Sequence, residues 1–127
     1  MSTPQVISTP KAPAAIGPYS QAIQLGNWVF TSGQIGLNPS TGDLVGPSTA
    51  EQARQAFTNL KAVAEQAGGS LANVVKFTLF LTDLSEFAEV NAIMQEFVSA
   101  PFPARSTVGV ASLPKGARFE VEAILAL

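Results

Sequence analysis

The chemistry available to this chain centres on Arg105, which lies in the run Pro101-Phe102-Pro103-Ala104-Arg105-Ser106-Thr107. The sequence has no histidine and no cysteine, which excludes a Ser-His-Asp triad, a thiolate nucleophile and a Cys/His zinc site. What remains is a guanidinium that can bind a carboxylate with two parallel hydrogen bonds, a few hydroxyls, and Glu120 and Glu122 near the C-terminus. This set favours binding of a small carboxylate and activation of water, without covalent catalysis.

Three further segments hold polar groups in positions that suit a ligand. Gly17-Pro18-Tyr19-Ser20 combines a flexible joint with a fixed φ and would bring the Tyr19 hydroxyl to a pocket rim, although a packed loop tyrosine is the simpler alternative. Thr31-Ser32-Gly33-Gln34 ends a predicted strand, where its small residues suit either a ligand near the main chain or a β-bulge. Asn91 falls on the apolar stripe of a predicted helix, and a buried amide there needs a partner, most simply a nearby loop.

Motifs and charge exclude several other classes of function. The glycine-containing loops match neither G-x-G-x-x-G nor G-x-x-x-x-G-K-[ST], so no nucleotide site is expected. Glu120 and Glu122 are adjacent on one strand face, whereas a glycosidase needs carboxylates on opposite sides of a sugar. The net charge is −2 and the 7 lysines and arginines are scattered singly, so nucleic acid is not an expected partner.

The sequence also indicates where the protein acts. No apolar run approaches the roughly 20 residues needed to cross a bilayer, so no membrane partner is expected. The first residues show no charged-then-apolar pattern of a signal peptide, and the absence of cysteine fits a reducing compartment. We therefore expect a cytoplasmic location.

The elements that must position these groups follow from periodicity and turn signals. Short strands are predicted at residues 5–8, 21–25 and 28–32, the last two joined by a Gly26-Asn27 turn, and a loop runs from Gln34 to Pro47. The capping box Ser48-Thr49-Ala50-Glu51 starts a helix that ends at Gly68-Gly69. Its predicted core face is Ala53, Phe57, Leu60, Ala64 and Ala67. A strand at 75–82 and a helix at 85–99 follow.

The C-terminal part is predicted to be a hairpin, with Ala104–Ser112 and Ala117–Leu127 flanking Leu113-Pro114-Lys115-Gly116. In that hairpin, residues 112 and 117, 107 and 122, and 105 and 124 face each other. Arg105, Thr107, Glu120 and Glu122 would then share one face of the sheet. The alternative for this grouping is a plain Arg–Glu pair on a solvated face.

The order β-β-β-α-β-α-β-β predicts a single α+β domain over residues 1–127, a mixed sheet with two helices packed on one face. Only 13% of the residues are charged, against about 25% in an average globular protein. With so few charged side chains, the helix-free face of the sheet is expected to be too apolar to lie against water. We therefore expect a homo-oligomer, with a barrel-like assembly of several sheets as one way to cover that face.

Five segments taken together resemble the RidA family, also called the YjgF family. They are Ala14-Ala15-Ile16-Gly17-Pro18-Tyr19-Ser20-Gln21-Ala22, Thr31-Ser32-Gly33-Gln34-Ile35, Phe102-Pro103-Ala104-Arg105-Ser106, Leu113-Pro114-Lys115-Gly116 and Phe119-Glu120-Val121-Glu122-Ala123. The resemblance implies a chorismate-mutase-like fold assembled as a homotrimer with sites between subunits. It also implies a 2-iminobutanoate/2-iminopropanoate deaminase, which hydrolyses reactive imines and enamines from pyridoxal-phosphate enzymes to 2-keto acids and ammonia. Neither a cofactor nor a metal is implied.

Carried over residue by residue, the resemblance implies that Arg105 binds the substrate carboxylate and that Glu120 serves the catalytic water. Tyr19, Ser32, Gly33 and Asn91 match other pocket positions. Thr107 stands where some members have cysteine, which leaves a backbone role but no thiol role.

Two alternatives belong to other classes of protein. One is a chaperone-like or sensing module that binds small carboxylates without turnover. The other is the ribonuclease or translation-inhibitor activity ascribed to some family members, which the absence of histidine and of a basic patch disfavours.

Overall fold

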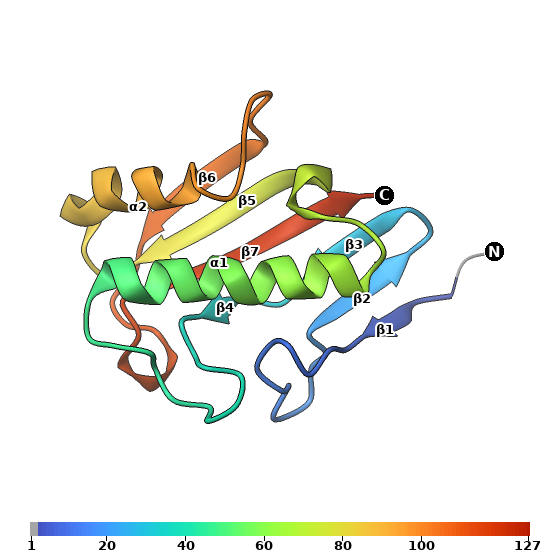
Figure 1. The fold of residues 1–127 in the computed structure, drawn as a ribbon, viewed down its shortest axis with the longest axis horizontal. Coiled ribbons are helices and arrows are strands. Elements are labelled where there is room, and N and C mark those ends of the chain that lie inside the picture. Colours follow the sequence, from blue (N-terminus) through green and yellow to red (C-terminus); the bar gives the residue numbers. More distant parts are fainter. Residues whose placement is uncertain (1–2) are drawn as a thin grey trace.

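Two α-helices lie on the same face of a mixed β-sheet in the computed structural model, which describes residues 3–127 (Figure 1). The strands are β1 (Gln5–Ile7), β2 (Ala22–Leu25), β3 (Trp28–Thr31), β4 (Gln34–Ile35), β5 (Val74–Leu81), β6 (Ala104–Gly109) and β7 (Phe119–Ala126). The helices are α1 (Thr49–Gln66) and α2 (Phe87–Met94), with one-turn 3₁₀ helices η1 (Leu71–Asn73), η2 (Leu84–Glu86) and η3 (Pro114–Gly116). The sheet order is β1-β2-β3-β7-β5-β6, and β4 also pairs with β7. The predicted α+β class, with both helices on one face, is confirmed.

Helix α1 forms where its capping box and periodicity predict. The Ser48 Oγ accepts a hydrogen bond from the Glu51 N–H at 3.1 Å and caps the first turn. Phe57 is fully buried, and its ring packs on Phe77 of β5, Phe97 and Phe119 of β7. These contacts set α1 across the centre of the sheet. No helix in residues 3–127 is long and apolar enough to span a membrane.

The opposite face of the sheet carries exposed apolar side chains. Trp28 and Phe30 of β3 are 49% and 46% exposed, and Val6, Leu25 and Val108 are also open to solvent. Within residues 3–127, no helix covers this face (Figure 1). A single copy of the chain therefore leaves an apolar sheet surface in contact with water, as the sparse charge predicts.

The predicted C-terminal hairpin is wrong, because β6 and β7 do not pair with each other. β5 lies between them, parallel to β6 and antiparallel to β7. The physical reason is the helix that joins β5 to β6, since a strand–helix–strand segment places its two strands in parallel. The chain from 110 to 118 then crosses the end of β5, a step of about 10 Å that nine residues span easily.

Two boundaries also differ from the prediction. Residues 34 and 35, assigned to a loop, form β4, which pairs with Val121 and Glu120 of β7 and is too short to give a periodic pattern. The helix predicted at 85–99 is shorter, because η2 forms its entry and α2 ends at Met94. The residues beyond α2 still pack on the core, since the Phe97 ring stacks on Phe57 at 5.3 Å.

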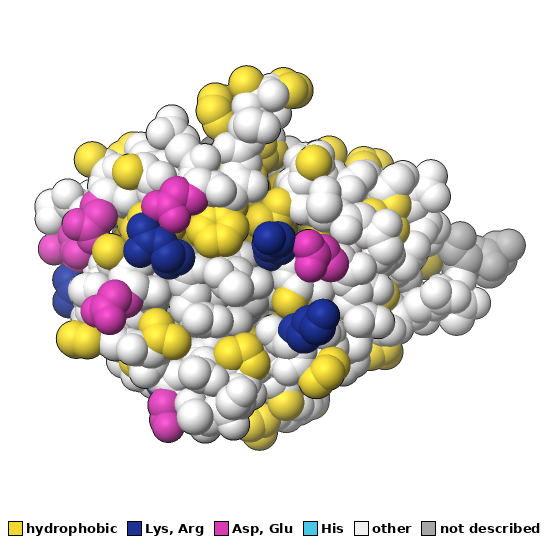
Figure 2. Space-filling view, viewed as in Figure 1, with side chains coloured by type: hydrophobic (Ala, Val, Ile, Leu, Met, Phe, Trp, Pro, Cys, Tyr) yellow, Lys and Arg dark blue, Asp and Glu magenta, His cyan; other side chains and the backbone are white. Residues whose placement is uncertain are grey.

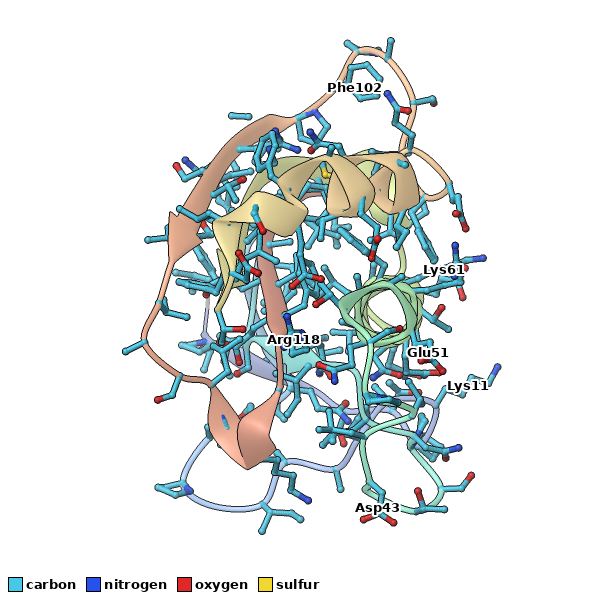
Figure 3. All side chains as sticks on the ribbon, turned by 90° about the vertical axis from the view of Figure 1, so that its left-hand side faces the viewer. Lys11, Asp43, Glu51, Lys61, Phe102 and Arg118 are labelled. Carbon is cyan, nitrogen blue, oxygen red and sulfur yellow. The ribbon has the colours of Figure 1, made fainter. Side chains whose placement is uncertain are left out.

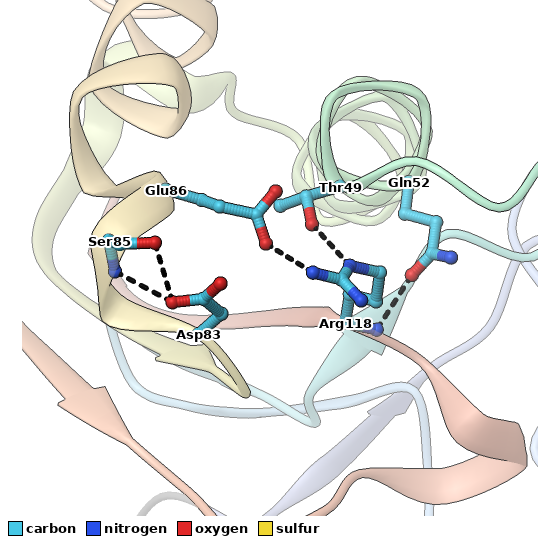
Figure 4. Close-up of polar contacts among 6 residues, drawn as sticks. All are labelled: Thr49, Gln52, Asp83, Ser85, Glu86 and Arg118. Carbon is cyan, nitrogen blue, oxygen red and sulfur yellow. Dashed lines mark hydrogen bonds and ion pairs between the residues drawn. The ribbon is translucent and has the colours of Figure 1, made fainter.

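A buried glutamine joins α1 to the loops on either side of it. Gln52 is 2% exposed, donates from Nε2 to the Gly46 carbonyl at 2.9 Å and accepts from the Arg118 N–H at 2.7 Å. The Arg118 guanidinium continues the network to the Thr49 hydroxyl at 2.8 Å and to the Glu86 carboxylate (Figure 4). One set of hydrogen bonds thus fixes the start of α1, the entry to α2 and the approach to β7.

We predict that Gln52→Met lowers the free energy of unfolding by about 2–4 kcal/mol, because it leaves a part-buried carbonyl and a part-buried N–H without partners. Urea denaturation at a fixed protein concentration measures the change. Gln66→Met, at an exposed position on the same helix, is the matched control and should change stability by less than about 0.5 kcal/mol. Equal losses in the two variants would contradict the role given to Gln52.

Candidate functional site

One group of the predicted site residues lines a cavity of about 780 Å³. Tyr19, Ser32, Gly33 and Glu120 all contribute to its wall, which is built from segments 13–21, 32–42 and 114–115 and from Glu120 of β7. Lys115 also lines this cavity, and its Nζ donates to the Gly42 carbonyl at 2.8 Å, which joins two of the wall segments. The structure therefore brings one carboxylate, four hydroxyl groups and an ammonium group around one space.

Gly33 lies at a break between two strands that both pair with β7. β3 pairs with residues 124–126 and β4 with residues 120–121. At this break the Ala123 N–H of β7 donates to the Thr31 hydroxyl at 2.9 Å. A side chain thus replaces the main-chain acceptor that a continuous strand would offer. A Cβ on Gly33 would lie 2.7 Å from the Glu120 carboxyl carbon. The lack of a side chain at Gly33 therefore leaves room for the Glu120 carboxylate in its present position.

The Glu120 carboxyl is half-buried on the helix-free side of β7, next along that face to Glu122. Burial raises the pKa of Glu120 above its ordinary value, and the negative charge of Glu122 raises it further. A carboxylate with a raised pKa is a better proton acceptor than one in bulk water. This environment suits exchange of a proton with a water molecule in the cavity.

The loop that carries Tyr19 is held by a buried side chain. Gln21 is 3% exposed; its Oε1 accepts from the Thr9 N–H at 2.7 Å, and its Nε2 donates to the carbonyls of Thr9, Ala12 and Pro13. The Tyr19 hydroxyl in turn accepts from the Ile16 N–H at 3.3 Å. Gln21 was not among the predicted site residues; its place at the start of a predicted strand gave no signal for this role.

The second group of predicted residues, Asn91 and Arg105, lies in a separate cleft of about 420 Å³. Met94, Gln95, Val98, Phe102 and Pro103 form the rest of its wall. Phe102 is at the tip of a loop that projects beyond α2 (Figure 3). The cleft therefore combines one guanidinium with a largely apolar lining.

The Arg105 guanidinium is fixed on one side and free on the other. Its Nη1 donates to Asn91 Oδ1 and lies 3.7 Å from Met94 Sδ. Among residues 3–127, Nε and Nη2 of Arg105 have no hydrogen-bond partner. Arg54 binds the Glu96 carboxylate through that same Nε–Nη2 edge, at 3.0 and 2.8 Å. The free edge of Arg105 thus has the geometry for a carboxylate bound by two parallel hydrogen bonds.

The two groups do not meet within one chain, and the prediction that Arg105, Thr107, Glu120 and Glu122 share a face is wrong. Arg105 and Thr107 are beside Phe77 and Leu79 on the helix side of the sheet. Glu120 and Glu122 are beside Phe80 and Thr78 on the opposite side. The inserted β5 changes the register assumed for a hairpin and puts the cation and the carboxylates on opposite faces.

Thr107 lines neither the 780 Å³ cavity nor the 420 Å³ cleft. Its hydroxyl is buried and has no hydrogen-bond partner among residues 3–127. Those residues also contain no cluster of His, Cys, Asp or Glu side chains that could hold a metal ion.

Comparison with known proteins places these features in a family. The family model described as Endoribonuclease L-PSP matches residues 9–127. The chain is 52% identical over 127 residues to a 2-iminobutanoate/2-iminopropanoate deaminase of Dermatophagoides farinae, covering 100% of this chain and 99% of the relative. The chain belongs to this family, the RidA (YjgF) family.

Solved structures of RidA-family proteins have the same fold. RidA from the Antarctic bacterium Psychrobacter sp. PAMC 21119 is 52% identical, with a TM-score of 0.93 over 97% of this chain and 99% of that one. TdcF of E. coli, solved with bound serine, is 42% identical, with a TM-score of 0.91 over 97% of this chain and 98% of that one. The predicted family and fold are confirmed.

In this RidA-family chain, we predict that Glu122→Gln lowers the pKa of Glu120. The substitution removes the nearby negative charge and keeps the side-chain shape, so ionisation of Glu120 becomes easier. A ¹³C NMR titration of the side-chain carboxyl groups measures the pKa in both proteins. Glu89→Gln on α2 is the control and should leave the Glu120 titration unchanged. A pKa that did not fall in Glu122→Gln would show that burial alone sets it.

Proposed function

We propose that this chain is a 2-iminobutanoate/2-iminopropanoate deaminase that binds its substrate carboxylate on the Nε–Nη2 edge of Arg105. The activity is that of its full-length 52% identical relative, an imine hydrolase acting on a C–N bond. The observation that carries the proposal is the Arg105 guanidinium, oriented by Asn91 and open on the edge that takes a carboxylate. TdcF, solved with serine, is a family member that holds a small molecule with a carboxylate.

The reaction needs little beyond this binding and one proton carrier. The imine carbon is already electrophilic; an enamine first becomes an imine when one proton is added to its carbon and one is lost from its nitrogen. Water adds to the imine carbon while the Glu120 carboxylate accepts its proton, and the same proton passes to the nitrogen. The resulting carbinolamine carries OH and NH2 on the same carbon; Glu120 takes the hydroxyl proton and delivers it to the nitrogen while the C–N bond breaks and the C=O bond forms, so a 2-keto acid and ammonia leave. The raised pKa of Glu120 suits both halves of this transfer.

The site is completed by a second copy of the chain. Arg105 and Glu120 are on opposite faces of the sheet, in separate cavities, so one copy cannot offer both to a small substrate. The exposed Trp28 and Phe30 on the helix-free face supply apolar surface for contact between copies. We propose a homotrimer, with Arg105 from one copy and Tyr19, Ser32, Gly33 and Glu120 from its neighbour at each site.

The surface gives less support to a ribonuclease, despite the family description. The chain has no histidine for acid–base work on RNA. Arg54 and Arg118, two of its three arginines, are paired with Glu96 and Glu86. Charges of both signs are scattered over the helix-bearing face rather than gathered into a basic patch (Figure 2). A module that binds carboxylates without turnover would use the Arg105 cleft but would have no need of Glu120.

We predict that Arg105→Ala lowers kcat/KM by about 100-fold or more, because two hydrogen bonds to a charged group are lost. An amino-acid oxidase would generate 2-iminobutanoate and 2-iminopropanoate in the cuvette, and formation of the keto acid would be followed. Arg54→Ala is the matched control, since it removes an ion-paired surface arginine and should keep wild-type activity.

Arg105→Lys should also lose most of the activity, because a lysine keeps the charge but not the two-pronged geometry. Turnover by Arg105→Ala equal to that of the wild type would rule out the carboxylate clamp. A folded, assembled wild type that bound 2-oxobutanoate without accelerating imine hydrolysis would support the binding module instead.

We predict that two inactive variants restore activity when they assemble together. Arg105→Ala and Glu120→Gln, co-expressed at equal levels with different tags, would form mixed oligomers. Random mixing gives about a quarter of the sites an intact Arg105 from one copy and an intact Glu120 from its neighbour. Activity should therefore return to about a quarter of the wild-type value.

The control for this experiment is a mixture of the two variants purified separately, which should stay inactive unless the subunits exchange. Mass spectrometry of the doubly purified oligomer gives its stoichiometry and tests the trimer. Inactive mixed oligomers would show that each site takes both residues from the same copy.

A further inference from the structure

We infer that Phe87 is a positioning residue for the carboxylate clamp, holding the Arg105 guanidinium against its ring so that the Nε–Nη2 edge faces the substrate. The Arg105 Cζ lies 5.0 Å from the centre of the Phe87 ring, within the range of a cation–π contact. The inference rests on the proposed function and adds to it a residue that touches neither the substrate nor the reacting atoms.

The need for such a residue follows from where Arg105 lies. It is on β6, an edge strand of the sheet, and its side chain is exposed. A long side chain in water samples many rotamers, and ordering it costs conformational entropy. The bond to Asn91 fixes Nη1 alone, and the guanidinium can still swing about that point. A ring beneath Cζ restricts this remaining motion.

The contacts around the Arg105 guanidinium occupy part of its surface and leave one edge open. Asn91 and Met94 contact Nη1, and the Phe87 ring lies against the guanidinium near its central carbon Cζ. All three residues belong to α2, one or two turns apart, so a single helix orients the cation. What remains for a ligand is the Nε–Nη2 edge.

Phe87 itself is held by the network around Arg118. It is the first residue of α2 and follows Glu86, whose carboxylate binds the Arg118 guanidinium (Figure 4). Asp83 caps the preceding turn by accepting from the Ser85 N–H at 3.0 Å. The ring is 37% exposed, whereas Val90 and Met94 of the same helix are buried. Its contact with Arg105 gives a reason for that exposure.

The test compares Phe87→Leu, which keeps an apolar side chain, with Phe87→Tyr, which keeps the ring. Calorimetric titration with 2-oxobutanoate, the keto-acid product, should show about 3- to 30-fold weaker binding by Phe87→Leu and near-wild-type binding by Phe87→Tyr. In the oxidase-coupled assay KM should rise by a similar factor while kcat changes little, because the clamp holds ground state and transition state alike.

A spectroscopic readout tests the contact without reference to activity. The chain has only three arginines, so its Arg Nε–H NMR signals are few, and loss of one in Arg105→Lys assigns that of Arg105. The Phe87 ring current should displace this signal in the wild type and in Phe87→Tyr. In Phe87→Leu it should move toward the position of an arginine side chain free in water.

Phe97→Leu is the matched control, since the Phe97 ring stacks on Phe57 in the core and not on the guanidinium. It should lower Tm while leaving the affinity for 2-oxobutanoate unchanged.

Light scattering of each variant reports assembly, and weaker binding together with loss of the oligomer would assign Phe87 to the subunit interface and overturn the inference. Unchanged affinity and an unchanged Arg105 signal in Phe87→Leu would do the same. A wild type that neither binds 2-oxobutanoate nor hydrolyses imines would refute the proposed function instead, and the Nε–H signal would still decide the contact.

Discussion

The pairing of β5 on both of its edges is the constraint on which the rest of the structure depends. Its core side presents Phe77, Leu79 and Leu81, all fully buried beneath the helices. A strand so apolar is most stable in the interior of a sheet, and here it takes β6 on one edge and β7 on the other. This placement decides on which face each functional side chain emerges. It puts the Arg105 guanidinium under α2 and the Glu120 carboxyl on the helix-free side.

Buried polar side chains of α1 then build the cavity around Glu120. Asn59 is fully buried and donates from Nδ2 to the carbonyls of Ile35 and Leu37, at 3.3 and 2.9 Å. Gly36 passes so close to the helix that a Cβ there would be 2.5 Å from the Gln52 Cα. The start of the long loop after β4 is thus pinned to α1. A helix that is apolar by periodicity therefore carries the polar groups that shape the cavity wall.

The elements with local signals were predictable from sequence. The Ser48 cap, the Gly26-Asn27 turn between β2 and β3 and the buried stripe of α1 all depend on residues close together in the chain. The pairing of β6 was not, because the choice between β5 and β7 depends on which long-range contact buries more apolar surface. The sequence order strand–helix–strand did contain the correct signal, but the short connection before β7 indicated a hairpin.

The functional site was likewise predictable from sequence only in part. Residue types and family resemblance identified seven candidates, and the structure places six of them on the wall of one of two cavities: Tyr19, Ser32, Gly33, Asn91, Arg105 and Glu120. The seventh, Thr107, lines neither. Their separation into two groups depends on the sheet order and could not be read from spacing. Gln21 and Phe87 escaped notice because a strand-initial glutamine and a helical phenylalanine are ordinary in sequence. Only the three-dimensional contacts distinguish them from neighbours of the same type.

Assembly and chemistry are thereby coupled in the proposed enzyme. The face that leaves Trp28 and Phe30 in water also carries Glu120 and Glu122, so contact between copies that covers the aromatic side chains removes water from the carboxylates as well. Removing water from a carboxylate raises its pKa and strengthens its interaction with any cation that enters the site. An isolated copy would hold Arg105 and Glu120 apart, with Arg105 exposed and Glu120 only half-buried. The same burial that stabilises the oligomer would therefore add to the burial that already raises the pKa of Glu120 in a single copy, and it would bring Arg105 of a neighbour to that carboxylate, which makes activity a property of the assembly rather than of the folded chain.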